Sequence, residues 1–96
     1  MPRYLSQHTL ACLTRQGAEE LARRLHAARQ VTARRVVVNM QEGKMLVELD
    51  APGRDDLEKF FALEKFHFDW ILRLEFESVA DPDGSPGAGG SLRPLP

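Results

Sequence analysis

The sequence predicts an α+β domain in which one four-stranded antiparallel sheet carries two helices on the same face. The first observation is the order of the periodic segments, which runs strand, helix, strand, strand, helix, strand. The second is a Glu-Gly turn between two adjacent alternating segments, which indicates a central hairpin. Two strand–helix–strand crossovers around a hairpin place both helices on one side of the sheet.

The first strand and helix come directly from residue spacing. Residues 3–13 alternate as a strand does, and neither of their faces is wholly polar, which is typical of a strand covered on both sides. Thr14 is a suitable N-cap residue. Over residues 15–29, alanine and leucine recur at helical spacing with arginines turned outward, so we expect an amphipathic helix there.

The hairpin and second helix follow. Residues 34–41 and 44–51 flank Glu42-Gly43, and Gly43 tolerates the positive φ of a tight turn. Asp55 or Asp56 can cap the next helix after the Pro52-Gly53 break. The side chains expected to be buried from these segments are Met45, Val47, Leu49, Leu57, Phe60, Phe61 and Leu63 or Glu64.

The last strand is expected over residues 69–79, whose alternation is clean. The element order then predicts a ferredoxin-like βαββαβ fold over residues 1–79. Residues 80–96 are rich in Pro, Gly and Ser and should form a flexible tail, from which Leu92 and Leu95 could dock on a partner subunit. The last-strand side chains expected to pack under the helices are Trp70, Leu72, Leu74 and Phe76.

Composition limits the function classes. The 96 residues suffice for one domain, and the net charge of −1 lacks the basic excess that drives nucleic-acid binding. Cys12 is the only cysteine, so no intramolecular disulfide can form. The chain shows no signal-peptide pattern and no apolar run of about 20 residues. We therefore expect a cytoplasmic protein without nucleic-acid or membrane partners.

The sheet face opposite the helices has no cover within this domain. Its expected side chains mix apolar and polar types, which suits a face that a second copy of the chain closes over a partly wet cavity. An exposed, solvated sheet is the simpler alternative. The sequence does not decide which alternate residues of the first two strands point to this face. For the first strand they are Ser6 and His8 or their neighbours, and for the second they are Val37 and Asn39 or Val36 and Val38. The other residues expected on this face are Glu48, Ile71, Arg73 and Glu75.

Short motifs over about residues 3–79 resemble a known family. They are Arg3-Tyr4 through His8, Glu42-Gly43-Lys44, Asp50-Ala51-Pro52 and Phe68-Asp69-Trp70-Ile71. The chain resembles small nickel-binding-type proteins of the dimeric α+β barrel superfamily, whose relatives include cofactor-free monooxygenases and muconolactone isomerase-like enzymes. The resemblance implies sheet-to-sheet pairing of two copies around a cavity. Where metal-binding members carry Asp-x-His, this chain has Ser6-Gln7-His8.

His8 is the leading candidate for chemistry, because a neutral imidazole on a half-buried strand can shuttle a proton or bind a metal. With Glu48 and Arg73 on the same face, it could deprotonate an acidic carbon while the guanidinium holds the oxyanion. The alternatives are a histidine that only hydrogen-bonds a neighbour and a cross-strand ion pair of little consequence. For nickel or another divalent metal, His8 would need further donors such as Glu48, Asp50 or Glu75.

The sequence thus predicts a homodimeric, small-molecule-binding protein with a cavity over the uncovered sheet face. The alternatives are a cofactor-independent isomerase or monooxygenase-like enzyme using His8 and Arg73, a nickel-binding protein using His8, and a dimer without a ligand. The residues predicted to contact the small molecule are Ser6, His8, Asn39, Glu48 and Arg73.

Overall fold

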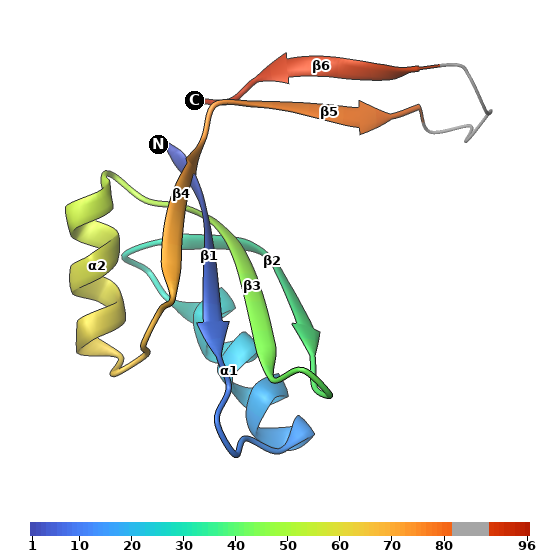
Figure 1. Ribbon diagram of the computed structural model, residues 1–96. Coiled ribbons are helices and arrows are strands. Elements are labelled where there is room, and N and C mark those ends of the chain that lie inside the picture. The colour runs from blue at the N-terminus through green and yellow to red at the C-terminus, as the bar shows by residue number, and fades with distance from the viewer. Residues whose placement is uncertain (82–88) are drawn as a thin grey trace.

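The computed structural model describes residues 1–81 and 89–96 as an α+β protein with two antiparallel sheets (Figure 1). The elements, in chain order, are β1 (Arg3–Thr9), α1 (Arg15–Ala27), β2 (Thr32–Asn39), β3 (Lys44–Asp50), α2 (Arg54–Leu63), β4 (Trp70–Leu74), β5 (Phe76–Ala80) and β6 (Gly90–Pro94).

The main sheet has the strand order β2-β3-β1-β4, and every neighbouring pair in it is antiparallel. Strands β5 and β6 form a separate two-stranded sheet. Neither helix in the described part of the chain is long and apolar enough to cross a bilayer.

The core lies between the main sheet and the two helices. Alternation along β3 turns Met45, Val47 and Leu49 to this side, where all three are fully buried. Leu25 of α1 and Phe61 of α2 belong to the same buried cluster, so both helices cover the same sheet face. Burial of β3 and of the α2 positions Leu57, Phe60 and Phe61 confirms the predicted stripe, whereas Leu63 is exposed and Glu64 is half-buried.

The ends of the helices follow local chemistry. The Thr14 hydroxyl accepts a hydrogen bond from the backbone N–H of Gly17 at 3.1 Å, which confirms the predicted N-cap of α1. The N-cap of α2 is Gly53, which offers no side chain for capping. Asp55 and Asp56 instead lie in the first turn, where their charges favour the positive end of the helix dipole.

The face assignment predicted for the last strand is wrong. Arg73 lies opposite Tyr4 and Ile71 lies opposite Ser6, so pairing with β1 turns Ile71 to the helices, where it is buried. Leu72, on the other face, is 53% exposed. The prediction failed because β4 carries apolar residues on both faces, so its parity depends on pairing with β1 and not on its own pattern. The residues that do not pack beneath the helices as predicted are Trp70, Leu72, Leu74 and Phe76.

The expected single strand over residues 69–79 is broken at Glu75, and β5 leaves the main sheet there. Strand β6 lies within the expected tail and pairs with β5, while residues 82–88 of that tail lie outside the described residues. The resulting β5–β6 hairpin projects away from the body on the side opposite α2 (Figure 1). The backbone N–H of Leu95 donates to the carbonyl of Glu75 at 2.9 Å and closes the base of this hairpin.

Candidate functional site

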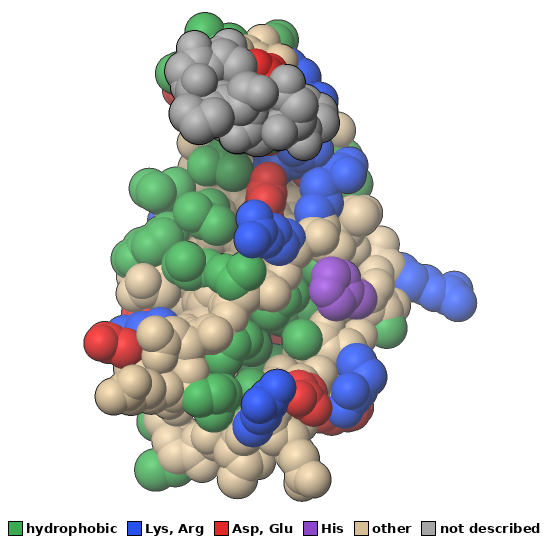
Figure 2. All heavy atoms as spheres, turned by 90° about the vertical axis from the view of Figure 1, so that its right-hand side faces the viewer, with side chains coloured by type: hydrophobic (Ala, Val, Ile, Leu, Met, Phe, Trp, Pro, Cys, Tyr) green, Lys and Arg blue, Asp and Glu red, His purple; other side chains and the backbone are tan. Residues whose placement is uncertain are grey.

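The open face of the main sheet is the side that neither helix covers. Register and alternation place Leu5, Leu46, Val37 and Leu72, one from each strand, on this face. Figure 2 views the molecule from the side toward which the hairpin projects, and hydrophobic side chains there are interspersed with charged ones. An antiparallel sheet can face water on one side, but the exposure of Leu72 is more typical of a surface that binds something.

Two adjacent hollows lie on this face. One, of about 240 Å³, is lined by Leu5, Val37 and Leu46, with Arg35 and Glu48 at its polar positions. The other, of about 210 Å³, shares Val37 and Leu46 with the first. We refer to the two together as the open-face groove. The additional residues that line its second part are Gln7, Val38, Asn39 and Lys44.

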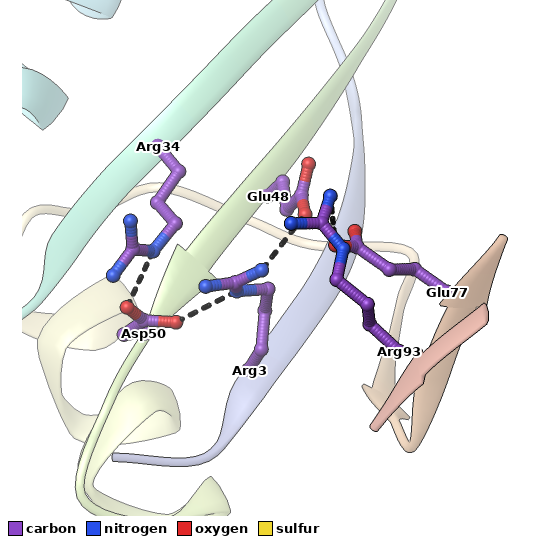
Figure 3. Close-up of polar contacts among 6 residues, drawn as sticks. All are labelled: Arg3, Arg34, Glu48, Asp50, Glu77 and Arg93. Atoms are coloured by element: carbon purple, nitrogen blue, oxygen red, sulfur yellow. Dashed lines mark hydrogen bonds and ion pairs between the residues drawn. The ribbon is translucent and has the colours of Figure 1, made fainter. Parts of the chain in front are cut away.

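An ion-pair cluster lies beside the groove (Figure 3). Asp50 accepts hydrogen bonds from Arg3 at 3.1 Å and from Arg34 at 2.5 Å, and Arg3 also lies 3.9 Å from the Glu48 carboxylate. Burial alone would raise the pKa of Asp50, but the hydrogen bonds and charges of the two arginines outweigh it and lower the pKa. The cluster therefore keeps Asp50 ionised and joins β1, β2 and β3 at one end of the sheet.

Two of the predicted ligand contacts, Glu48 and Asn39, do line the open-face groove. Asn39 also stabilises the β2–β3 turn, because its side-chain oxygen accepts a hydrogen bond from the backbone N–H of Glu42 at 2.9 Å. Among the described residues, the ion pair of Glu48 is the 3.9 Å contact with Arg3, so its carboxylate can reorient toward a bound group.

His8 and Ser6 lie on the other face, fully buried between the sheet and the helices. The Nδ1 atom of His8 lies 2.7 Å from the carbonyl oxygen of His67, and Nε2 lies 2.8 Å from the Ser6 hydroxyl. A carbonyl can only accept, so Nδ1 carries the proton and Nε2 accepts from the serine. Both ring nitrogens are therefore occupied.

The surroundings of His8 keep it neutral. Its ring stacks on Phe66 with centroids 3.8 Å apart and meets the edge of Phe61 at 4.9 Å. Burial lowers the pKa of His8, and the His67 carbonyl and the charge of Asp69 only partly oppose this effect. This arrangement is a satisfied core histidine.

The structure does not bring His8, Glu48 and Arg73 together. His8 lies beneath the helices and Glu48 lies on the open face, while Arg73 is an exposed residue of the edge strand whose register partner is Tyr4. The expectation that the three share one face is wrong, because both faces of β1 contain apolar and polar residues. Buried Tyr4 fixes the parity of the strand, and it takes Ser6 and His8 inward.

The residues present do not fit the metal site that the resemblance implies. His8 has no free nitrogen, and within the described ranges no group of three or more His, Cys, Asp or Glu side chains could hold a metal ion.

Sequence reasoning missed several residues of the open face, among them Arg3, Arg35 and Leu46. The signal that could have found Arg3 is its charge, because pairing a basic residue with Glu48 and Asp50 on the neighbouring strand fixes the register. That register turns the odd-numbered residues of β1 outward.

Comparisons of the chain with protein-family models, curated proteins and solved structures gave no match.

Proposed function

We propose that the chain is a homodimeric protein of the ferredoxin-like type that binds a small molecule over the open face of its main sheet. The observation that carries this proposal is the open-face groove, in which the aliphatic side chains of Leu5, Val37 and Leu46 lie beside the charged groups of Arg35 and Glu48. Binding sites for small molecules combine an apolar lining with a few polar groups that fix orientation.

A roof supplied by a second copy would turn the groove into a cavity. Each hollow is shallow and smaller than the 300–1,000 Å³ of typical ligand pockets, so one chain encloses little of a ligand. The open face carries apolar side chains together with charges of both signs, as in Arg3 and Glu48. A two-fold symmetric interface needs such a self-complementary surface, because each patch meets its own copy.

The β5–β6 hairpin supports the same partner. Phe76 lies opposite Pro94 and Ser78 lies opposite Leu92, so one hairpin face is largely apolar. On that face Phe76 is 68% and Leu92 is 73% exposed. An isolated two-stranded hairpin is marginally stable in water, and burial against another surface would stabilise it.

The hairpin cannot cover its own sheet with this apolar face. Its other face carries the Glu77–Arg93 ion pair of 3.1 Å, and Figure 3 shows both side chains extending toward Glu48 of the main sheet. Phe76 and Leu92 therefore point away from the molecule to which they belong. We propose that they pack against the second copy.

The groove favours a ligand with an apolar body and an anionic group. Its three aliphatic side chains would contact the body, and Arg35 would pair with the anion. The alternatives of a His8-dependent enzyme and of nickel binding both need a free nitrogen on His8, and its two hydrogen bonds leave neither ring nitrogen available. The geometry therefore favours binding over either alternative.

Light scattering and a fluorescent probe test the proposal. The wild-type chain should have twice the mass of the 10.8 kDa monomer and should bind the fluorescent fatty acid cis-parinaric acid, which is apolar and anionic and has no aromatic ring. Val37→Trp fills the groove and should weaken probe binding about tenfold or more. Leu63→Trp, on the exposed side of α2, is the matched control and should bind as the wild type does. A monomeric mass at about 100 µM, or equal binding by the two variants, would contradict the proposal.

A further inference from the structure

The second binding feature lies on the opposite side of the molecule, between α2 and the segment that connects it to β4. A hollow of about 530 Å³ is lined there by the aromatic rings of Phe61, Phe66 and Phe68. This volume lies within the range of typical small-molecule pockets. The additional lining residues are Glu58, Ala62, Lys65 and His67.

The aromatic wall is held in place from beneath. Phe66 stacks on the fully buried His8 ring, and Phe61 meets Phe66 edge to face with centroids 5.8 Å apart. The carbonyl of His67 accepts the His8 Nδ1–H. The buried His8 thus fixes both the ring and the backbone of the connecting segment, so the hollow is already formed before anything binds.

Lys65 lies at the rim in an unfavourable backbone conformation. Its φ is +54°, in the left-handed region. The N–H of Lys65 bonds to the carbonyl of Ala62, and the N–H of Phe66 bonds to that of Phe61 at 2.9 Å. These bonds define the helix-ending motif in which glycine is preferred at the position of Lys65. A lysine there costs about 1 kcal/mol relative to glycine, and strained positions of this kind cluster at binding sites.

The charges at the rim indicate the sign of the ligand. Glu58 lies 3.5 Å from Arg54, which offsets its charge. Within the described residues, Lys65 has no carboxylate within 4.0 Å. An ammonium group without a partner therefore stands at the edge of a pocket walled by three phenylalanines.

We infer that this hollow binds a small aromatic carboxylate, whose ring packs among Phe61, Phe66 and Phe68 while Lys65 pairs with the carboxylate. The site is independent of the open-face groove and of dimer formation. It also accounts for the choice of lysine at a position where glycine would make the helix end more stable.

Titration with phenylacetate, followed by amide chemical shifts, tests the inference, with neutral phenylacetamide as the matched probe. Phenylacetate should perturb the amides of residues 61–68 and should bind about three- to fivefold more tightly than the amide, as expected for an exposed ion pair. No perturbation of these amides, or equal binding of the two probes, would overturn the inference.

Three variants separate charge from backbone strain. Lys65→Gly should raise the melting temperature by roughly 4 °C because it relieves the strain, yet weaken phenylacetate binding about three- to fivefold. Lys65→Gln should weaken binding equally without raising the melting temperature, and Lys65→Arg should preserve binding. If phenylacetate binds Lys65→Gly and Lys65→Gln as tightly as the wild type, the lysine is not a ligand contact and the inference fails.

Discussion

Burying a histidine requires partners for both of its nitrogens, and this chain supplies one from the same strand and one from a distant loop. Ser6 donates to Nε2, and the carbonyl of His67 accepts from Nδ1. The imidazole is neutral because its burial between the sheet and the helices disfavours the charged form and lowers the pKa of His8. His8 therefore couples the folded state to the proton concentration near neutral pH.

The first prediction is that acidification destabilises the protein below about pH 6.5, the ordinary pKa of histidine in an unfolded chain. Burial lowers the pKa of His8 in the folded state, so the unfolded state binds the proton first. The stabilisation is complete above pH 6.5 and is lost as the pH falls toward the folded-state pKa. Urea unfolding should show that the free energy of unfolding falls between pH 7 and pH 5.

His8→Gln is the test variant, because its amide can still donate to His67 and accept from Ser6 but does not titrate. It should remove most of the dependence on pH in this interval, whereas His26→Gln, at an exposed position of α1, should retain it. Asp50 and Asp69 do not interfere. Their folded-state pKa values are lowered, so the stabilisation they provide persists above about pH 3.8 and is lost only in stronger acid.

Among the elements, the hairpin of β2 and β3 depends on one backbone conformation. Gly43 has a φ of +66°, in the left-handed region that favours glycine. Its carbonyl accepts the N–H of Leu10 at 2.7 Å, so the turn also holds the residue that follows β1. The strongest strand pairing predicted from the sequence thus requires glycine at this position.

The second prediction is that Gly43→Ala lowers the free energy of unfolding by about 1 kcal/mol, because alanine is strained at this φ. Gly43→Asn is the matched control, because asparagine adopts the left-handed region more readily than alanine and should lose less stability. A Cβ atom at residue 43 would come no closer than 3.5 Å to the backbone carbonyl of Leu10, so space does not limit either variant. Denaturant unfolding at neutral pH compares them, and equal losses in the two variants would show that the turn conformation is not the cause.

At the scale of the whole molecule, the relative position of two exposed surfaces that carry apolar side chains determines how a second copy could bind. The open face of the main sheet and the Phe76–Leu92 face of the hairpin belong to one chain, but the hairpin turns its charged face toward its own sheet. In a two-fold symmetric dimer, each hairpin could pack on the open face of the other copy. Both surfaces would then be covered in both copies.

The third prediction is that Leu92→Asp weakens dimer formation at least tenfold, because it places a charge on the apolar face of the hairpin. Val79→Asp lies on the opposite face of the same hairpin and should leave the dimer intact. Sedimentation equilibrium over a range of concentrations measures both. If Leu92→Asp associates as strongly as Val79→Asp, the hairpin does not contact the partner.

A strand could be predicted from the sequence where residues close together in the chain determine which of its faces is buried. Strand β3 was correct because its apolar residues occupy one face only, as Met45, Val47 and Leu49. Strand β4 was misread because apolar side chains occupy both of its faces, and only its pairing with β1 decides between them. Pairing of this kind links segments far apart in the chain, and no local pattern encodes it.

The same limit applies to the candidate site. Glu48 and Asn39 were found because the β2–β3 hairpin is local, whereas the inward position of His8 depends on Tyr4 and on His67, which is distant in sequence. Its role in the structure agrees with the alternative kept open at the sequence level, a histidine that only hydrogen-bonds its neighbours. The pairing of β5 with β6 was missed because the sequence after Ala80 is rich in Pro, Gly and Ser, a composition that does not indicate a strand.

The break at Glu75 has one more consequence. In the described part of the chain, the buried cluster contains no residue beyond Ile71. Among the described residues, those after Glu75 therefore add nothing to this buried cluster. Substitutions at the described positions of the hairpin should therefore change the surface that it presents to its surroundings while the buried cluster of the body stays intact.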